Sequence, residues 1–186
     1  MTRVMIHTEL HSMTTVITAQ ASFEALAWLE AFDHGGVVVE ALTLPDEAAL
    51  GAMMDRCSRT TLFHRFHSYT DGRAYLRTLF GTGRDQPTLL AWHGAACIGI
   101  ANLATDSTGI ADVGVLVEDA WQRRGVGSRL VSDLCDIARS RGVTRVHADV
   151  LGDDQHVLRT LRKFGPLTVS LASGTFSVDL DLGPGR

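Results

Sequence analysis

One strand-to-helix junction constrains the fold of this 186-residue chain more than any other feature. Residues 110–117, IADVGVLV, are rich in β-branched side chains and predict a strand, and residues 124–140 repeat apolar side chains at the spacing of a long amphipathic helix. Gly125 and Gly127 lie where this helix begins. Glycines let a backbone approach a ligand closely, and the free N–H groups of a first helical turn attract anions. The junction therefore predicts an anion site that suits a pyrophosphate.

The spacing of these glycines argues against two common phosphate-binding motifs. G-x-G-x-x-G, typical of dinucleotide sites, and G-x-x-x-x-G-K-[ST], typical of P-loops, are both absent from the chain. What remains is Q-x-x-G-x-G over residues 122–127, in which Arg123 and Arg124 add permanent positive charge. The pattern thus excludes a P-loop and gives only weak support to a dinucleotide fold.

Strand and helix signals alternate around this junction. In chain order they predict a helix at 23–32, a strand at 37–42, a helix from 45, a short helix ending near 79, strands at 88–92, 96–104 and 110–117, the helix at 124–140, a strand at 143–150, a helix at 153–163, and a hairpin of strands at 167–171 and 175–182. Residues 58–61, Ser-Arg-Thr-Thr, are expected to be a break rich in capping residues. This order predicts an α/β (α+β) fold built on a mixed sheet.

Composition argues against several classes of partner. The chain has 17 Lys plus Arg against 21 Asp plus Glu, and its formal charge of −4 argues against nucleic-acid binding. No apolar run approaches the roughly 18 residues of a membrane span, and the first 20 residues lack the apolar centre of a signal peptide. The 3 cysteines are widely spaced and fit neither a disulfide framework nor a zinc site. We therefore expect a cytoplasmic protein with no metal, no membrane contact and no nucleic-acid partner.

The glycine turn and its flanks together resemble a known family. Q-R-R-G-V-G, preceded by VLVEDAW and followed by SRLVSDLCDIARSRGVTRVHADVL, is similar to the GNAT superfamily of acetyl-CoA-dependent N-acetyltransferases. The resemblance covers about residues 37–182 and implies a mixed, mostly antiparallel sheet flanked by helices. It implies an acetyltransferase domain at 36–186, preceded by an N-terminal arm and extra helix at 1–35. The role of residues 1–35 stays open between packing on the sheet, covering the groove and joining two copies as a homodimer.

The resemblance also implies which residues bind acetyl-CoA. In the family this turn holds the CoA pyrophosphate, a role that transfers to Arg123, Arg124, Gly125, Val126, Gly127 and Ser128. The strand before the turn offers backbone groups to the pantetheine arm and the thioester carbonyl, a role that transfers to Val115, Leu116 and Val117. An N–H directed at the thioester oxygen stabilises the developing oxyanion. Asp154 stands where many members have Asn at the start of the next helix, and it either contacts the ligand or caps that helix.

A second segment narrows the resemblance. SRTTLFHRFH at 58–67 is similar to the S-x-x-S/T-x-x-x-RF segment of the Pat-type bacterial protein lysine acetyltransferases. This likeness implies that Arg65 and Phe66 order the early helices over the acceptor groove. Pat-type enzymes also carry a catalytic Glu after an Ala in the strand that precedes the glycine turn. Here that position is Asp112, whose side chain is one methylene shorter.

Two aspartates are candidates for the general base. A lysine acceptor arrives mostly protonated, since its reference pKa is about 10.4, and a base must remove a proton before the nitrogen attacks. Asp112 matches the Pat-type Glu and is favoured. Asp149 matches the Glu that serves as base in ribosomal-protein N-terminal acetyltransferases, and either aspartate also fits a structural carboxylate. In many members a Tyr protonates the CoA thiolate, and Leu161 stands at its position here. Pat-type enzymes also lack this Tyr, so its absence is compatible with activity.

The expected activity is transfer of an acetyl group from acetyl-CoA to a primary amine by direct attack in a ternary complex. A protein lysine is the favoured acceptor, and a small-molecule amine is the alternative. An N-terminal amine is a further alternative, which predicts dependence on Asp149. Because the Tyr is missing and Asp112 replaces Glu, a non-catalytic acyl-CoA-binding sensor with the same fold also stays open.

Overall fold

Strands and helices alternate through the part of the chain that the computed structural model describes, residues 36–81, 86–105, 111–152 and 154–183. The strands are β1 (Val37–Ala41), β2 (Thr88–His93), β3 (Ala96–Thr105), β4 (Ala111–Val117), β5 (Arg145–Leu151), β6 (Leu167–Ala172) and β7 (Thr175–Asp181). The helices are α2 (Glu47–Arg56), α3 (Arg59–Phe66), α4 (Arg73–Gly81), α5 (Val126–Ser140) and α6 (Gln155–Leu161), with the 3-10 turns η2 (Leu44–Asp46) and η3 (Asp119–Trp121). The helix expected at 23–32 lies outside the described residues.

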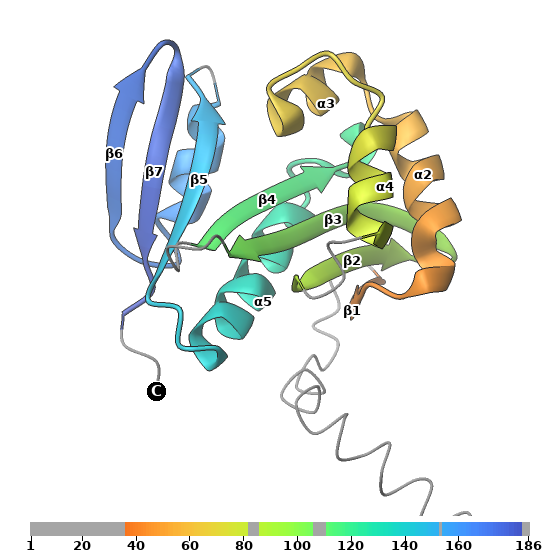
Figure 1. Cartoon of the computed structure of the whole chain (residues 1–186), viewed down its shortest axis with the longest axis horizontal. Helices are drawn as coiled ribbons and strands as arrows, with labels where there is room; N and C mark the ends of the chain where they lie inside the picture. Colours follow the sequence, from red (N-terminus) through yellow and green to blue (C-terminus); the bar gives the residue numbers. More distant parts are fainter. Residues whose placement is uncertain (1–35, 82–85, 106–110, 153, 184–186) are drawn as a thin grey trace, which may run out of the picture. The chain divides into compact units, whose positions relative to one another are not determined.

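The strands form one 7-stranded sheet in the order β1-β2-β3-β4-β5-β7-β6 (Figure 1). Neighbouring strands run antiparallel except for β4 and β5, which run parallel. Helices α2 and α4 pack on one face of the sheet, and α5 packs on the other. The expected mixed, mostly antiparallel sheet flanked by helices is therefore confirmed.

The prediction of a break at residues 58–61 was wrong. Residues 59–61 form the first turn of α3, a third helix between β1 and β2 where the sequence predicted two. The hydroxyl oxygen of Ser58 accepts a hydrogen bond from the N–H of Thr61 at 3.1 Å. A capping residue of this kind satisfies a free N–H group of the first turn. The polar run that suggested a break is therefore the start of a helix.

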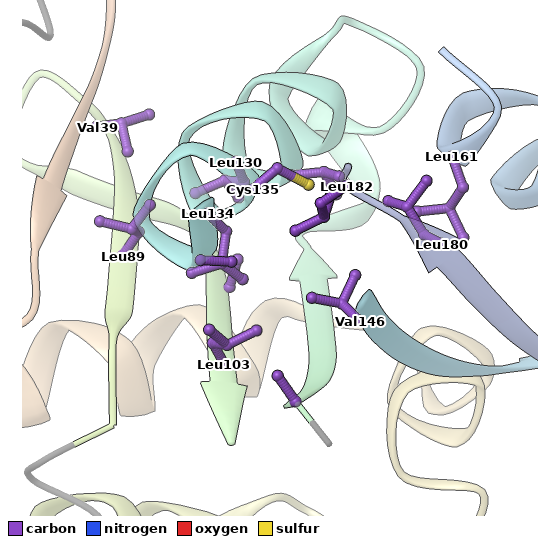
Figure 2. Packing of buried hydrophobic residues seen from close by; sticks show 14 of the residues in the cluster. Val39, Leu89, Leu103, Leu130, Leu134, Cys135, Val146, Leu161, Leu180 and Leu182 are labelled. Atoms are coloured by element: carbon purple, nitrogen blue, oxygen red, sulfur yellow. The ribbon is translucent and has the colours of Figure 1, made fainter. Parts of the chain in front are cut away.

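A large apolar core lies between α5 and the sheet (Figure 2). Leu130 and Leu134 of α5 are completely buried against side chains of the inner strands. Those strand residues include Leu89, Leu103, Val146 and Leu180. Each fully buried leucine contributes about 1.5–3 kcal/mol relative to an exposed one. The core therefore holds α5 on the sheet and fixes its first turn beside the end of β4.

A second apolar core joins α2 and α4 to the opposite face. Leu50 and Met53 of α2 are completely buried there. They pack in one cluster with Leu90, Ile100 and Leu116 of the sheet. Since α3 follows α2 directly and contacts β4, this core also sets the position of α3.

The pairing of β4 with β5 is much shorter than that of the other neighbours. Among the described residues, the pairs are Ala111 with Val146 and Asp112 with His147 and no others, whereas all of β4 pairs with β3. Beyond Asp112 the two strands separate, as Figure 1 shows. The sheet is therefore split at its parallel step, on the carboxyl side of these two pairs.

Candidate active site

The separation of β4 and β5 opens a cavity of about 520 Å³. It is bounded by both strands, by the first turn of α5, and by residues of α3 and α6. The sequence-predicted residues that line it are Val115, Leu116, Val117, Arg123, Gly125, Gly127, Ser128, Asp149 and Asp154. Asp112, Arg124 and Val126 are not part of its lining. The volume lies in the range of pockets that hold small molecules and cofactors.

The free edge of β4 presents backbone groups to this cavity. The N–H of Glu118 donates to a carbonyl of β3 at 3.0 Å. Because backbone groups alternate between the two edges of a strand, Leu116 also faces β3, while Val115 and Val117 face the cavity. The side-chain amide of Gln122 donates to the carbonyl of Val117 at 3.1 Å. The N–H and C=O of Val115 therefore lie on the side where a ligand amide or carbonyl can pair with them.

The glycine turn leaves the start of α5 open to an anion. Gly125 has a φ of 89° and is the N-cap of the helix, with no side-chain cap hydrogen bond. Left-handed backbone of this kind favours glycine, and uncapped N–H groups of a first turn attract anions. A Cβ at Gly127 would meet only a methyl group of Val117, at 3.7 Å. The missing side chain at Gly127 therefore leaves free space on the cavity wall.

The other predicted residues of the turn have different surroundings. Arg123 lines the cavity and has a φ of 57°, whereas the guanidinium carbon of Arg124 lies 5.3 Å from the ring centre of Trp121. Val126 is 4% exposed and packs in the core beneath α5. Arg123 is thus the member of the arginine pair that the structure brings to the cavity.

Asp119 joins the N-terminus of α3 to the turn before α5. One carboxylate oxygen accepts from the backbone N–H of Ser58 at 2.8 Å, and the other accepts from the hydroxyls of Ser58 at 2.7 Å and Thr61 at 2.9 Å. The side-chain amide of Gln122 donates to the Thr61 hydroxyl at 3.0 Å. Burial alone would raise the pKa of Asp119, but these hydrogen bonds hold the pKa below its ordinary value. The first half of the S-x-x-T-x-x-x-RF segment thus fastens α3 beside the cavity.

The second half of that segment places Arg65 over β4. A Cβ at Gly114 would collide with the guanidinium of Arg65, which lies in that space. The guanidinium Nη2 donates to Oδ1 of Asn102 at 2.9 Å, and the hydroxyl of Tyr75 donates to the same oxygen at 3.1 Å. The ring centres of Phe66 and Tyr75 lie 5.2 and 5.3 Å from the guanidinium carbon. Arg65 is therefore held against the strand while it also lines the cavity.

The two candidate bases lie on the same face of the sheet. Asp112 is exposed and belongs to the last residue pair before β4 and β5 separate, opposite His147. Side chains alternate along a strand, so Asp149, two residues after His147, projects on that same face. The side chain of Asp149 is 55% exposed, and the residue lines the cavity. The prediction that the strands of the two aspartates are neighbours is confirmed.

His147 is a residue of this region that the sequence did not single out. Its Nδ1 lies 3.0 Å from Oδ1 of Asp179 on β7, and its Nε2 lies 3.4 Å from Oδ1 of Asp149. Burial alone would lower the pKa of His147, but the hydrogen bond to Asp179 and the charges of Asp149, Asp179 and Asp112 raise it. Strand alternation could have placed His147 beside Asp149. The contact with Asp179 depends on β7, rather than β6, lying against β5.

Asp154, at the start of α6, and His64, on α3, both line the cavity. Asp154 is at the N-cap position of α6 but makes no cap hydrogen bond through its side chain. Its Oδ2 lies 3.6 Å from Nδ1 of His64 on α3. Leu161 also lines the cavity and is 3% exposed. An aliphatic side chain has no proton to give to a leaving group, so position 161 supplies no general acid.

The described residues contain no group of three or more His, Cys, Asp or Glu side chains arranged to hold a metal ion. In the same part of the chain, no helix is both long enough and apolar enough to cross a membrane. Burial raises the pKa of Cys57 to about 12 and the pKa values of Cys97 and Cys135 to about 11. These thiols are therefore protonated near neutral pH.

A family model matches the part of the sequence that forms the walls of the cavity, and this match identifies the family. The model of the family described as "Acetyltransferase (GNAT) family" matches residues 55–165, which is more than half of the chain. The chain belongs to the GNAT acetyltransferase family. As a GNAT protein it is an acyltransferase. The matched range runs from the end of α2 to the residues that follow α6, so it includes α3, β4, the glycine turn and β5.

Solved structures of GNAT proteins share the fold. The GNAT domain of PAT from S. lividans is similar with a TM-score of 0.69 and 24% identity, covering 78% of this chain and 90% of that one. An acetyltransferase from Salmonella typhimurium, solved with its cofactor acetyl-CoA, gives 0.63 and 18%, covering 80% and 95%. A ribosomal-protein-alanine N-acetyltransferase from Brucella melitensis gives 0.63 and 17%, covering 78% and 99%. At these identities the likeness shows a common fold.

Proposed function

We propose that this GNAT chain transfers the acetyl group of acetyl-CoA to a primary amine, with a protein lysine as the favoured acceptor. The observation that carries the proposal is the cavity between β4 and β5. It has the uncapped first turn of α5 at one end and the carboxylate of Asp149 on its wall. A pyrophosphate, a thioester arm and an ammonium group would each meet a group of matching chemistry there. The lysine preference is supported by the contacts of Ser58, Thr61 and Arg65, which give the Pat-like segment a role beside this cavity.

The residues that line the cavity fit acetyl-CoA, which would supply the activated acetyl group. The N–H groups at the start of α5 and the side chain of Arg123 would bind the pyrophosphate. The free space at Gly127 allows the phosphates to approach the backbone. The cavity-facing N–H of Val115 would pair with a carbonyl of the pantetheine arm or with the thioester oxygen. In the second case it would stabilise the negative charge that develops there.

Asp112 and Asp149 are the proposed carboxylates at the acceptor end. A carboxylate attracts an ammonium group and can take part in its deprotonation. Asp149 lines the cavity, and Asp112 lies on the same face where β4 and β5 begin to separate. We expect Asp112→Asn to reduce transfer to lysine if the site works as in Pat-type enzymes. Greater dependence on Asp149 would instead indicate an N-terminal amine as acceptor.

Isothermal titration of the full chain with acetyl-CoA tests the first half of the proposal. We expect binding in the micromolar range or tighter. Gly127→Ala should weaken it at least tenfold, because the new methyl group enters the space kept free on the cavity wall. Gly81→Ala is the matched control, since a Cβ at Gly81 meets nothing within 4 Å. No heat of binding with the wild-type chain would reject the proposal.

Release of CoA in the presence of different amines tests the second part of the proposal, the transfer of the acetyl group to an amine. The acceptors are a lysine peptide with a blocked N-terminus, a lysine-free peptide with a free N-terminus, and a polyamine. Fastest turnover with the lysine peptide supports the favoured acceptor, and fastest turnover with the polyamine supports the small-molecule alternative.

A non-catalytic acyl-CoA sensor is the second candidate function. It is favoured by one observation, the aliphatic side chain of Leu161 on the cavity wall, which leaves the departing thiolate without a tyrosine there. Tight acetyl-CoA binding with no CoA release from any amine in the panel would support the sensor and reject the transferase.

A further inference from the structure

His147 does not itself line the cavity, but it immediately precedes the β5 residues that do. It is the β5 partner of Asp112 in the last residue pair before β4 and β5 separate. The next residues of β5, Ala148 and Asp149, already line the cavity. The side chain of His147 is 25% exposed, so its ring is partly open to solvent. An imidazole therefore stands at the closed end of the split in the sheet, on the same face as Asp149.

The contacts of the ring fix which nitrogen carries the proton. Nδ1 lies 3.0 Å from Oδ1 of Asp179. An ionised carboxylate only accepts hydrogen bonds, so Nδ1 must be the donor in this pair. In the neutral imidazole the lone pair is then on Nε2. Asp179 thus fixes the tautomer of His147 and leaves Nε2 as the basic nitrogen.

The contacts of Nε2 with described residues are long. It lies 3.4 Å from Oδ1 of Asp149 and 3.4 Å from the hydroxyl oxygen of Ser177. Both distances exceed those of a well-formed hydrogen bond to nitrogen, which is about 2.9–3.0 Å. Within the described part of the chain, Nε2 therefore has no close partner and lies equally near Asp149 and Ser177, so a substrate ammonium drawn to the carboxylate of Asp149 could reach it.

We propose that Nε2 of His147 accepts a proton from the acceptor ammonium, with Asp179 as the positioning residue and Asp149 as the carboxylate that attracts the ammonium. This assignment rests on the acetyl transfer proposed above and adds a catalytic residue to it. It separates two tasks that a single carboxylate would otherwise share. Asp149 supplies negative charge at the cavity wall, and His147 supplies a base.

The acceptor ammonium gives one proton to Nε2, which leaves a neutral amine and an imidazolium ion. The lone pair of the amine nitrogen then attacks the thioester carbonyl carbon, the C–N bond forms and the C–S bond breaks. The second proton lost by the nitrogen ends on the departing sulfur as the CoA thiol, and the imidazolium returns its proton to solvent.

Imidazole is a better match for this step than a carboxylate, because its basicity is closer to that of an alkylamine. The charged groups that face His147 are Asp112 from β4, Asp149 from its own strand and Asp179 from β7. Burial opposes their effect, yet together they raise the pKa of the ring above its ordinary value. The base form therefore exists above that raised pKa, so activity should increase as pH rises through it.

The experiment measures kcat/KM against pH with the acceptor that the amine panel identifies, using the full chain. We expect the wild-type profile to rise through one inflection, and His147→Gln to lose this inflection and at least about 100-fold of kcat/KM above it. Its affinity for acetyl-CoA should be unchanged. Asp179→Asn should move the inflection to lower pH, because the ring loses a partner that favours its charged form. His67→Asn is the control, because His67 is exposed, is the C-cap of α3 rather than a residue of β4 or β5, and has a φ of 50° that asparagine tolerates.

A second variant keeps the test valid if glutamine disturbs β5. His147→Ala should regain activity on addition of free imidazole, as a purely structural role would not. His147→Gln with an unchanged inflection and kcat/KM within threefold of wild type would overturn the assignment while acetyl transfer itself stands. A wild-type chain that binds acetyl-CoA but acetylates no amine would instead reject the proposed function, and the role of His147 with it.

Discussion

Replacing Gly114 with alanine tests how Arg65 is held over β4. The new methyl group would take the place of the guanidinium, which must then leave Asn102 and the rings of Phe66 and Tyr75. A hydrogen bond to a charged group contributes about 1.5–3 kcal/mol, and a cation–π contact at a partly exposed site contributes about 0.5–1 kcal/mol. Alanine regains about 0.5–1 kcal/mol over glycine within a strand. Because Arg65 is only half-buried, we expect a net loss of about 1–2 kcal/mol in the free energy of unfolding.

A double-mutant cycle isolates the cause of this loss. Urea unfolding of the full chain gives the midpoint for wild type, Gly114→Ala, Arg65→Ala and the double variant, with the m-value as a check on two-state behaviour. Without the guanidinium, the methyl group has nothing to displace, so Gly114→Ala should be neutral or slightly stabilising in the Arg65→Ala background. The two sites should therefore be coupled by about 1–3 kcal/mol. An equal cost of Gly114→Ala in both backgrounds would refute this account of Arg65.

Gly165→Ala should cost about 2–3 kcal/mol, because its Cβ would collide with a backbone carbonyl oxygen of β7, which cannot rotate away as a side chain can; a urea midpoint as high as that of Gly81→Ala would contradict this. Asp119→Asn should lower the urea midpoint at pH 7. The low folded-state pKa of Asp119 means that its stabilisation is lost as pH falls through that pKa, so the difference from wild type should close in acid; a difference independent of pH would argue against the role of its charge. Cys57 and Cys97, with pKa values raised to about 12 and about 11, should react with iodoacetamide at pH 8 far more slowly in the native chain than in urea; equal rates would show that the thiols are not shielded.

The strand–turn–helix junction could be predicted from the sequence because all of its signals are local. β-branched residues, two glycines and a helical repeat follow one another within residues 111–140. The structure begins α5 at Val126 rather than at 124, since Gly125 has left-handed backbone and serves as the N-cap. The neighbouring helix α3 was missed because Ser58 and Thr61 have the composition of a turn. Their role as a cap depends on the residues that follow.

The environment of His147 could not be predicted from the sequence, because it depends on the order of strands. A hairpin at 167–182 was expected, but the pattern does not say which of its strands lies against β5. With β7 in that place, Asp179 comes opposite His147, and with β6 there a different set of side chains would do so. The position of Arg65 over Gly114 is non-local in the same way. A glycine in a strand indicates that something approaches closely, but not what it is.

The short pairing of β4 with β5 has a mechanical consequence. The sheet has two halves, β1–β4 and β5–β7. In the described part of the chain, two residue pairs join their backbones, and α5 packs against both halves. Amide hydrogens along the two facing edges should exchange faster than those elsewhere in these strands, because few hydrogen bonds cross the seam. A ligand bound in the split would contact both halves of the sheet at once. It would add RT ln(1 + [L]/Kd) to the free energy of unfolding. The bound substrate would then fill the gap between β4 and β5, and the chain would be most rigid with substrate bound.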